Sequence, residues 1–324
     1  MLGLPKLQSH VGGYIKQING EISNLTQPDF INPIAQTIIS QGKRVRPIIL
    51  ILIAKLLGAK DEKSLIAAGT GIELIHLASL LHDDVVDQSD FRHNEKTAHI
   101  IFGNQQTILA GDFLFAESFK TMVQLGNLEI LKIISDTSSI LASGELIQLQ
   151  MKNKVFELDL PVYYDVIYKK TASLFEAAAK IGSHLSNPTF ASKVGEFGKS
   201  IGMAFQIIDD LLDYTSTESK KKIGADFYEG KITLPIIFAN STSSKLSKAE
   251  KISLRTLFLE TEKTAEHFAN ALSITEKSGA FEFCKNSALE FCTSAKNIIN
   301  EIGGKTAEGS LILEIIDFLI ERKF

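Results

Sequence analysis

Three observations predict that this chain has an all-α fold. Aliphatic residues recur three and four positions apart through most of its 324 residues, as they do on the buried face of a helix. Sustained alternation of apolar and polar residues is absent, and the Asn19-Gly20 pair has no strand-like flanks. Only seven prolines interrupt the periodic stretches. No Pro-, Ser- or Gly-rich linker divides the chain, so we predict a single large helical bundle, one domain of residues 1–324.

Composition narrows the class of protein further. The apolar fraction of 44% is ample for a core, and the net charge of −4 argues against non-specific attraction to nucleic acid. The two cysteines, Cys284 and Cys292, are too few for a disulfide framework and are expected to be core thiols in a reducing compartment. Residues 1–13 lack the features of a signal peptide, and no apolar run approaches the roughly 20 residues of a membrane span. These features predict a soluble cytoplasmic protein.

Two DDxxD motifs, at residues 83–87 and 209–213, lie within apolar, helix-like sequence. The first and last aspartates of each motif share a helix face, because residues four apart are neighbours on a helix. Two such faces turned toward each other would form a cage of carboxylates, which cannot all ionise unless cations neutralise them. The motifs therefore predict hard divalent cations and an anionic ligand that shares them. The six candidate metal-binding residues are Asp83, Asp84, Asp87, Asp209, Asp210 and Asp213.

Basic segments accompany both motifs. Residues 42–47, GKRVRP, place three cations before an apolar helix, in which Pro47 is expected to be the first residue. These cations either form a solvated helix start or bind an anion, which would offset their unfavourable position at the positive end of the helix dipole. Residues 220–222, KKK, and Lys231 follow the second motif. They either cover an anionic ligand or belong to a solvated loop.

Several single residues are candidates for the same site. His76 lies on the aspartate face of its helix, two turns or ~10 Å before Asp83 at 1.5 Å per residue, and is either a core histidine or part of the site. Arg92 is close enough in sequence to reach an anion held over the first motif, and its guanidinium suits phosphate; taken alone, it would be a surface arginine. Lys170 and Thr171 enter an apolar helix, either to hold phosphate oxygens or as an ordinary helix start.

Together these segments are similar to a known family. Residues 42–47, the two aspartate motifs, residues 170–172 (KTA), 205–210 (FQIIDD) and 229–235 (EGKITLP) occur in the family's order and cover most of residues 30–240. The chain therefore resembles the trans (E-) isoprenyl diphosphate synthases, also called polyprenyl synthetases. A single DDxxD motif would be weak support, whereas two of them with both flanking basic motifs are specific.

The resemblance implies an all-α fold around a central cavity, a homodimer and three Mg²⁺ ions. It implies that Asp83, Asp87 and Asp209 bind the metals directly. The other three aspartates would bind metal-bound water or orient the direct ligands. Lys43, Arg46 and His76 match the family's isopentenyl diphosphate-binding positions. His93 is a fourth candidate, because it stands where the family has a further arginine. The matched allylic diphosphate-binding residues are Arg92, Lys170, Lys221 and Lys231, and the catalytic candidates are Lys170, Thr171 and Gln206.

The residue types suit the reaction that the resemblance implies. Mg²⁺ takes one or two carboxylates together with substrate phosphates, so it can neutralise a departing diphosphate while the allylic C–O bond ionises. The alkene of isopentenyl diphosphate attacks the allylic cation, and a proton is then lost, for which the leaving diphosphate is a plausible base. An apolar cavity shields the cation from water. Thr171 and Gln206 can direct dipoles toward its positive charge.

Two departures from the family pattern concern the basic residues. The family usually has Arg-Arg-Gly after the first motif, where this chain has Arg92-His93-Asn94. The second arginine would contact isopentenyl diphosphate, so this contact falls to His93, whose charge changes near neutral pH. Lys220 stands where glycine is common, which leaves open which lysine of this loop reaches the substrate.

Chain length in this family depends on residues that block the cavity. The fourth and fifth residues before the first motif act as gates, and here they are Ser79 and Ala78, both small. The segment is therefore most similar to long-chain members such as octaprenyl, heptaprenyl or solanesyl synthases. Phe119 and Met122 on a later helix are candidates for a deeper floor. The small Gly198 and Gly202 before the second motif indicate either close helix packing or open volume for the chain.

Other readings remain open. The first is a short-chain synthase, with products of about C15–C20 as a shallower pocket would give. The second is a non-catalytic subunit of a heteromeric synthase, which would be expected to lose aspartates. The third is a terpene cyclase or head-to-head condensing enzyme, which would not be expected to carry residues 42–47, and the fourth is a helical protein with solvated acidic turns. Beyond its two substrates the protein is expected to bind no nucleic acid and to touch membranes at most peripherally, for product release.

Overall fold

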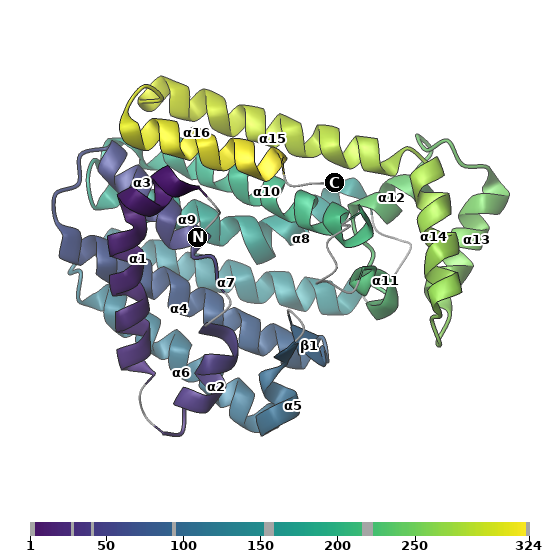
Figure 1. Ribbon diagram of the computed structural model, residues 1–324, viewed down its shortest axis with the longest axis horizontal. Helices are drawn as coiled ribbons and strands as arrows, with labels where there is room; N and C mark the ends of the chain where they lie inside the picture. The colour runs from purple at the N-terminus through teal and green to yellow at the C-terminus, as the bar shows by residue number, and fades with distance from the viewer. Residues whose placement is uncertain are drawn as a thin grey trace. The chain divides into compact units, whose positions relative to one another are not determined.

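The computed structural model of the chain describes residues 4–26, 29–39, 42–92, 95–151, 159–215 and 223–321. Most of these residues lie in helices, which Figure 1 labels, so the predicted all-α fold is confirmed. The chain divides into two compact units. Unit 1 comprises Met1–Thr137, Leu174–Gly198 and Ile298–Ile315, and unit 2 comprises Ser138–Ser173, Lys199–Asn297 and Ile316–Phe324. That the chain is a single domain stays a prediction.

Unit 1 is built around α4 (Glu62–Val86), against which α1, α3 and α6 pack. Residues 47–54 of α3 and 68–75 of α4 are all buried, as expected for helices that are apolar on every side. Glycine allows close approach, since a Cβ at Gly71 would lie 2.6 Å from Met122 Cε. The other elements of unit 1 are α1 (Pro5–Leu25), α2 (Asn32–Ile39), α3 (Val45–Leu56), β1 (Phe91–Arg92), β2 (Glu95–Lys96), α5 (Ala98–Phe102), α6 (Asn104–Val123), α9 (Ser173–His184, from its second residue) and η2 (Pro188–Phe190).

Helix α4 is longer and more apolar than expected, since no apolar run was predicted to approach the length of a membrane span. By length and composition alone this helix could cross a membrane. However, 67% of its most apolar 18-residue window is buried inside the protein. Most of the apolar surface in this window is therefore buried, as in a core helix.

Unit 2 contains the second aspartate motif and an aromatic cluster. Its elements are α8 (Leu160–Ile167), η1 (Tyr168–Ala172), α11 (Ala225–Glu229), α12 (Leu234–Asn240), α13 (Lys248–Leu259) and α14 (Ala265–Lys277), with most of α10 (Ala191–Thr215) and α15 (Ala280–Ile302). Two further helices, α7 (Leu128–Met151) and α16 (Ala307–Ile320), contribute residues to both units.

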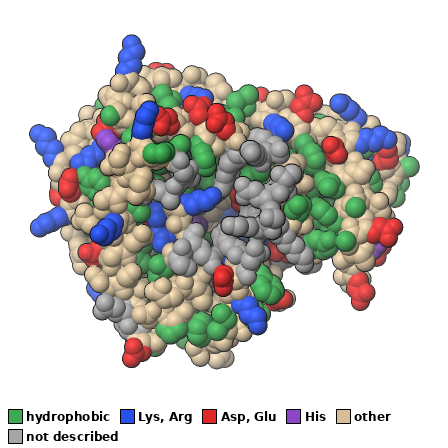
Figure 2. Space-filling view, in the orientation of Figure 1, with side chains coloured by type: hydrophobic (Ala, Val, Ile, Leu, Met, Phe, Trp, Pro, Cys, Tyr) green, Lys and Arg blue, Asp and Glu red, His purple; other side chains and the backbone are tan. Residues whose placement is uncertain are grey.

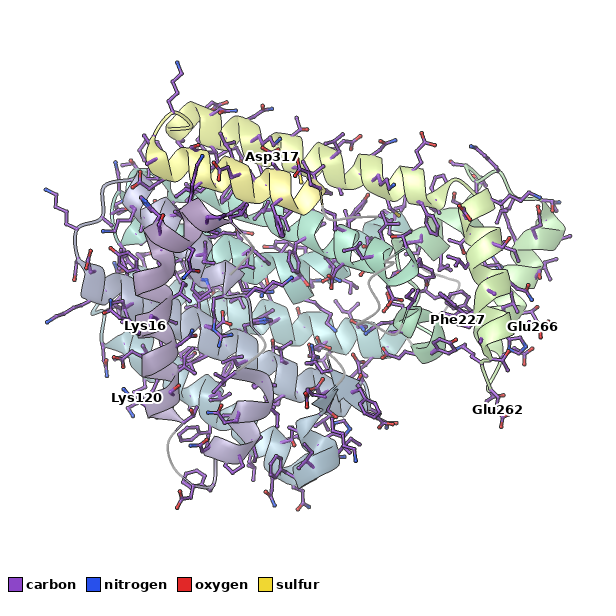
Figure 3. All side chains as sticks on the ribbon, in the orientation of Figure 1. Lys16, Lys120, Phe227, Glu262, Glu266 and Asp317 are labelled. Atoms are coloured by element: carbon purple, nitrogen blue, oxygen red, sulfur yellow. The ribbon has the colours of Figure 1, made fainter. Side chains whose placement is uncertain are left out.

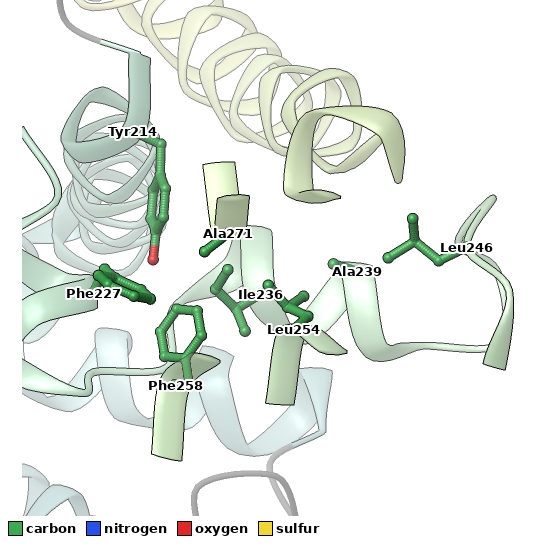
Figure 4. Close-up of a cluster of buried hydrophobic side chains, with 8 residues drawn as sticks. All are labelled: Tyr214, Phe227, Ile236, Ala239, Leu246, Leu254, Phe258 and Ala271. Carbon is green, nitrogen blue, oxygen red and sulfur yellow. The ribbon is translucent and has the colours of Figure 1, made fainter. Parts of the chain in front are cut away.

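The aromatic cluster of unit 2 fixes α11. Phe227 of α11 is fully buried, and its ring meets that of Phe258 edge-on, with centroids 4.9 Å apart. Ile236 and Leu254 pack in the same cluster, which Figure 4 shows. Figure 3 labels Phe227 on α11 and shows Glu262 at the surface, between α13 and α14. The helical hairpin α13–α14 thus holds α11 through buried apolar contacts.

Two local features differ from the sequence expectations. Helix α3 begins at Val45, with Arg44 as its N-cap residue, so the prediction that Pro47 begins the helix is wrong. Pro47 is tolerated two positions further in because the first N–H groups of a helix have no intrahelical partner. The second feature is the antiparallel pair of β1 and β2. Strands of two residues are too short to show alternating apolar and polar residues in the sequence.

Both cysteines are free thiols in the core, which confirms that part of the sequence analysis. Cys284 and Cys292 are each 0% exposed. Burial raises the pKa of the Cys292 thiol to about 11. Neither is a reactive thiolate at neutral pH.

Candidate active site

The first aspartate motif lies at the C-terminal end of α4. Asp83 and Asp84 belong to its last turn, Asp87 is its C-cap residue, and Gln88 ends the helix with a left-handed backbone, φ 54°. This end of a helix dipole is negative, so each carboxylate near it is disfavoured by about 0.3–1 kcal/mol. The motif is therefore stabilised by any cation that it binds.

Arg92 supplies one such cation. Strand β1 places it beside α4, where its Nε and Nη2 donate to Asp84 Oδ1 at 2.9 and 2.8 Å. Asp84 is buried, and its Oδ2 has no hydrogen-bond partner among the residues that the structure describes. The structure thus brings Arg92 to the first motif, where it bonds the middle aspartate. Its contact with a diphosphate stays a prediction.

A divalent cation fits the chemistry of the first motif. Carboxylate oxygens are the ligands that Mg²⁺ prefers in proteins, and the buried Asp84 Oδ2 is an acceptor that a cation or its bound water would satisfy. Across the described ranges, no three His, Cys, Asp or Glu side chains gather into a metal-binding cluster. Carboxylates repel one another until cations neutralise them. The metal-binding role of the six aspartates stays a prediction.

The three cations of the GKRVRP segment have different surroundings. Lys43 is exposed. Arg44 is buried, and its Nη1 lies 3.1 Å from Oε1 of Glu73 on α4. Arg46 lies over the ring of Phe175, 4.5 Å from the centroid. Because breaking a buried ion pair costs about 3–5 kcal/mol, Arg44 is committed to its partners inside the protein.

His76 follows Glu73 by one turn of α4 and lies among these cations. Burial, together with the positive charges of Arg46, Arg92 and Arg44, holds its pKa well below the ordinary 6.5. Burial also lowers the pKa of Arg46 to about 10, against the attraction of Glu73. His76 is therefore neutral at neutral pH in the free protein, and an anion bound here would relieve the mutual repulsion of the arginines.

The second aspartate motif lies in the last two turns of α10 and carries a chain of hydrogen bonds. Tyr163 donates its hydroxyl to Asp210 Oδ2 at 2.6 Å. Gln206 Nε2 donates to Asp210 Oδ1 at 2.7 Å, and Thr171 Oγ1 donates to Gln206 Oε1 at 2.7 Å. Burial raises the pKa of Asp210 to about 7, while these bonds oppose the rise. The chain brings together Thr171, Gln206 and Asp210, which the sequence predicted as site residues.

Asp213 holds the start of α11. Its carboxylate oxygens accept from the backbone N–H groups of Ala225, at 3.1 Å, and Asp226, at 3.0 Å. Lys231 follows α11 and is near enough to Asp210 to lower the pKa of that carboxyl. The last aspartate of the motif thus fixes the segment that leads to a predicted substrate lysine.

Lys170 and Thr171 lie in a π-helical turn, η1, between α8 and α9, so they are not at a helix start. Such turns are frequent at functional sites. Gly144 of α7 makes room for this one, since a Cβ there would lie 2.8 Å from Lys169 Cβ. The adjacent Glu145 binds Lys170, with Oε1 2.7 Å from Nζ. Lys170 therefore has a counter-charge before any substrate binds.

The remaining predicted residues have varied surroundings. Ala78 is fully buried, whereas Ser79 is half-buried and donates its hydroxyl to the His76 carbonyl at 2.8 Å. A Cβ at Gly198 would lie 2.5 Å from the Phe175 carbonyl, so close helix packing accounts for that glycine. Predicted residues outside the described part of the chain are His93, Lys220 and Lys221.

Sequence reasoning missed three residues that hold the predicted ones in place. Tyr163 precedes Lys170 by seven residues, two helical turns, so a search by helix face would have found it. Glu73 is a lone acid within a buried apolar run, which signals a buried ion pair. No sequence signal singled out Glu145.

Comparisons with known proteins identify the family. The sequence model of the family described as polyprenyl synthetase matches residues 28–275. The octaprenyl diphosphate synthase of Haemophilus influenzae is 35% identical over 299 residues, 91% of this chain and 88% of that protein. The short chain isoprenyl diphosphate synthase of Methanothermobacter thermautotrophicus is 31% identical, over 95% of both chains. A polyprenyl synthase from Caulobacter crescentus CB15, crystallised with calcium and isoprenyl diphosphate, has a TM-score of 0.91 at 32% identity, over 98% of both chains.

The fold and these matches define a trans-prenyltransferase. The chain belongs to the polyprenyl synthetase family, which uses divalent metal ions and isoprenyl diphosphate substrates.

Replacing Tyr163 by phenylalanine should destabilise the protein by about 1–3 kcal/mol, because Asp210 Oδ2 would lose its buried donor. Urea denaturation followed by circular dichroism measures this change. Tyr164→Phe is the matched control, since the Tyr164 ring packs edge-on against Phe291 and that contact survives loss of the hydroxyl. Equal stabilities of the two variants would contradict the importance of the Tyr163 bond.

Proposed function

We propose that this protein is a long-chain all-trans polyprenyl diphosphate synthase, which adds isopentenyl diphosphate head to tail to an allylic diphosphate. One observation carries the proposal: unit 1 contains two separate places suited to a diphosphate, one through metal ions and one through cationic side chains. One is the carboxylate motif with Arg92 at the end of α4. The other is the group of Arg46 and His76 beside the start of α3. An enzyme that bound a single diphosphate on metals would not need the second.

The roles of the residues follow from their chemistry. We propose that three Mg²⁺ ions bind to Asp83, Asp87 and Asp209. They would neutralise the departing diphosphate. Arginine and lysine side chains bind the diphosphate oxygens and orient the allylic carbon. We assign this role to Arg92, Lys170, Lys221 and Lys231. The chain of hydrogen bonds through Asp210 holds Gln206 and Thr171, whose oxygens can direct negative dipoles toward the allylic cation.

The second substrate is held without metals. Lys43, Arg46, His76 and His93 bind the diphosphate of isopentenyl diphosphate, which leaves its alkene to attack the allylic cation. The departing diphosphate then accepts the proton. The buried apolar residues of α4 beneath the motif keep water from the cation.

The chain is expected to work in the cytoplasm, on small molecules. On the face shown in Figure 2, acidic and basic side chains are interspersed among the residues drawn in colour, which gives no support to a nucleic-acid surface. We propose peripheral membrane contact only for release of a long apolar product.

The central test is incubation with Mg²⁺, farnesyl diphosphate and labelled isopentenyl diphosphate, followed by sizing of the products. We expect long-chain products, and at least a 100-fold loss of activity in Asp83→Asn, since electrostatic stabilisation of this kind is worth several kcal/mol. Short products would favour a short-chain synthase. Absence of any product would favour a non-catalytic subunit of a heteromeric synthase.

The gate assignment predicts a change in product length. Ala78→Phe places a ring beneath the metal motif and should shorten the product to about C15–C20, because the ring fills the path of the growing chain. Since Ala78 is fully buried, Ser79→Phe at the half-buried neighbouring position is the second variant. Unchanged product length in both variants, measured by chromatography, would refute the assignment.

We propose that a second copy of the chain covers an exposed apolar surface of unit 1. This surface lies on α5, α6 and the start of α7. Its residues are Ile100, Ile101, Ile108, Leu109, Val123 and Leu128, exposed by 41–80%. Large exposed apolar side chains on neighbouring elements are typical of interfaces.

The dimer proposal predicts that Leu109→Asp produces a monomer, because a charge would be buried at the interface. Sedimentation velocity measures the mass. Ile252→Asp on α13 is the control, since Ile252 is equally exposed, 65% against 66% for Leu109, and lies in the other unit. A wild-type protein that sediments as a monomer would overturn the proposal.

A further inference from the structure

The guanidinium of Arg44 is fully engaged within unit 1. Its Nε donates to Asn19 Oδ1 of α1 at 2.8 Å, and its Nη2 donates to the Ile39 carbonyl at the end of α2 at 2.6 Å. Its Nη1 donates to Glu73 Oε1 of α4 at 3.1 Å. Each nitrogen thus reaches a different helix. A side chain held in this way joins helices and does not serve as a ligand for a mobile substrate.

The backbone around Arg44 is shaped to this arrangement. Arg44 has a left-handed conformation, φ 55°, which non-glycine residues seldom adopt. A Cβ at Gly42 would lie 1.7 Å from Arg44 Nη1 and 3.4 Å from Glu73 Oε1. The chain therefore passes directly over the ion pair, and a side chain at position 42 would have to displace the guanidinium. Lys43 lies between these two constrained residues, so the ion pair fixes the point from which its side chain extends.

The same ion pair sets the surroundings of Arg46 and His76. Arg46 follows Arg44 by two residues, and its Nε is buried with no hydrogen-bond partner in the described part of the chain. Glu73 attracts Arg46, yet its Oε2 is likewise buried and unbonded within the described residues. Glu73 thus offsets the charge of Arg46 without taking up its donors. His76 stands one turn further along α4.

From this geometry we infer that Arg44 and Glu73 are positioning residues for the diphosphate of isopentenyl diphosphate. Their ion pair fixes the start of α3 against α4, and with it the backbone that carries Lys43 and Arg46 next to His76. The inference rests on the proposed function for the identity of the substrate. It divides the basic segment into one structural cation and two ligand-binding cations.

The test displaces the Arg44 guanidinium without changing any charge. In Gly42→Ala the new methyl group occupies the place of Nη1. Gly13→Ala is the control, because a Cβ at Gly13 on α1 would meet nothing within 4 Å among the described residues. We expect Gly42→Ala to raise KM for isopentenyl diphosphate about tenfold, the order expected for one misplaced charged donor. KM for the allylic diphosphate should change less than about twofold, and Gly13→Ala should match the wild type.

This pattern separates positioning from loss of stability. A variant that is merely less stable has fewer active molecules, which lowers the apparent kcat and leaves both KM values unchanged. If Gly42→Ala does not fold, Arg44→Lys serves in its place, because lysine keeps the charge but cannot reach three acceptors in one plane. An unchanged KM for isopentenyl diphosphate in a folded variant would overturn the inference.

A binding measurement keeps the inference distinct from the proposed function. Inorganic pyrophosphate is titrated calorimetrically without divalent cations, when the aspartate motifs repel anions. We expect binding to the wild type and about tenfold weaker binding to Gly42→Ala. This result would support the inference even if the wild type formed no prenyl product, an outcome that would defeat only the proposed function. Equal binding to the two proteins, or none to the wild type, would overturn the inference.

Discussion

The arrangement of the predicted site depends on carboxylates placed at the wrong ends of helices. Both α4 and α10 carry an aspartate motif at their C-terminal ends, where the negative end of the helix dipole disfavours carboxylates. The protein compensates locally. Asp84 bonds Arg92, Asp210 accepts from Tyr163 and Gln206, and Asp213 caps α11. The middle aspartate of each motif, and the last of the second, thus have partners within the protein.

The basic side chains of the GKRVRP segment also differ in their partners, since some are paired within the protein and others are proposed to bind ligands. Arg44 is paired with Glu73, whereas Arg46 is attracted by the same carboxylate but does not bond it, and it lies close enough to His76 to lower the pKa of that imidazole. A buried ion pair adds little net stability because desolvation offsets its attraction. Its value here is geometric, since it determines where the neighbouring cations point. The free protein therefore retains positive charge that a diphosphate would neutralise.

The family and the residue types of the site could be predicted from the sequence, because they depend on local pattern. The period of three to four residues gave the helices, and the order of the motifs gave the family. The errors concern contacts. Pro47 was expected to begin α3, but the buried Arg44 caps that helix two residues earlier. Lys170 and Thr171 could have been a helix start, but they lie in a π-helical turn that Gly144 accommodates.

By itself, the sequence determined that the chain is helical, that it carries two carboxylate motifs and that basic segments accompany them. Only the tertiary structure decided which charged side chains are paired with other groups of the protein. Arg44 and Glu73 are 29 residues apart, and Tyr163 and Asp210 are 47 apart. Helical periodicity reports neighbours within one or two turns. Which acid meets which base across helices depends on packing, and that packing separates the residues that hold the site from those that can bind its ligands.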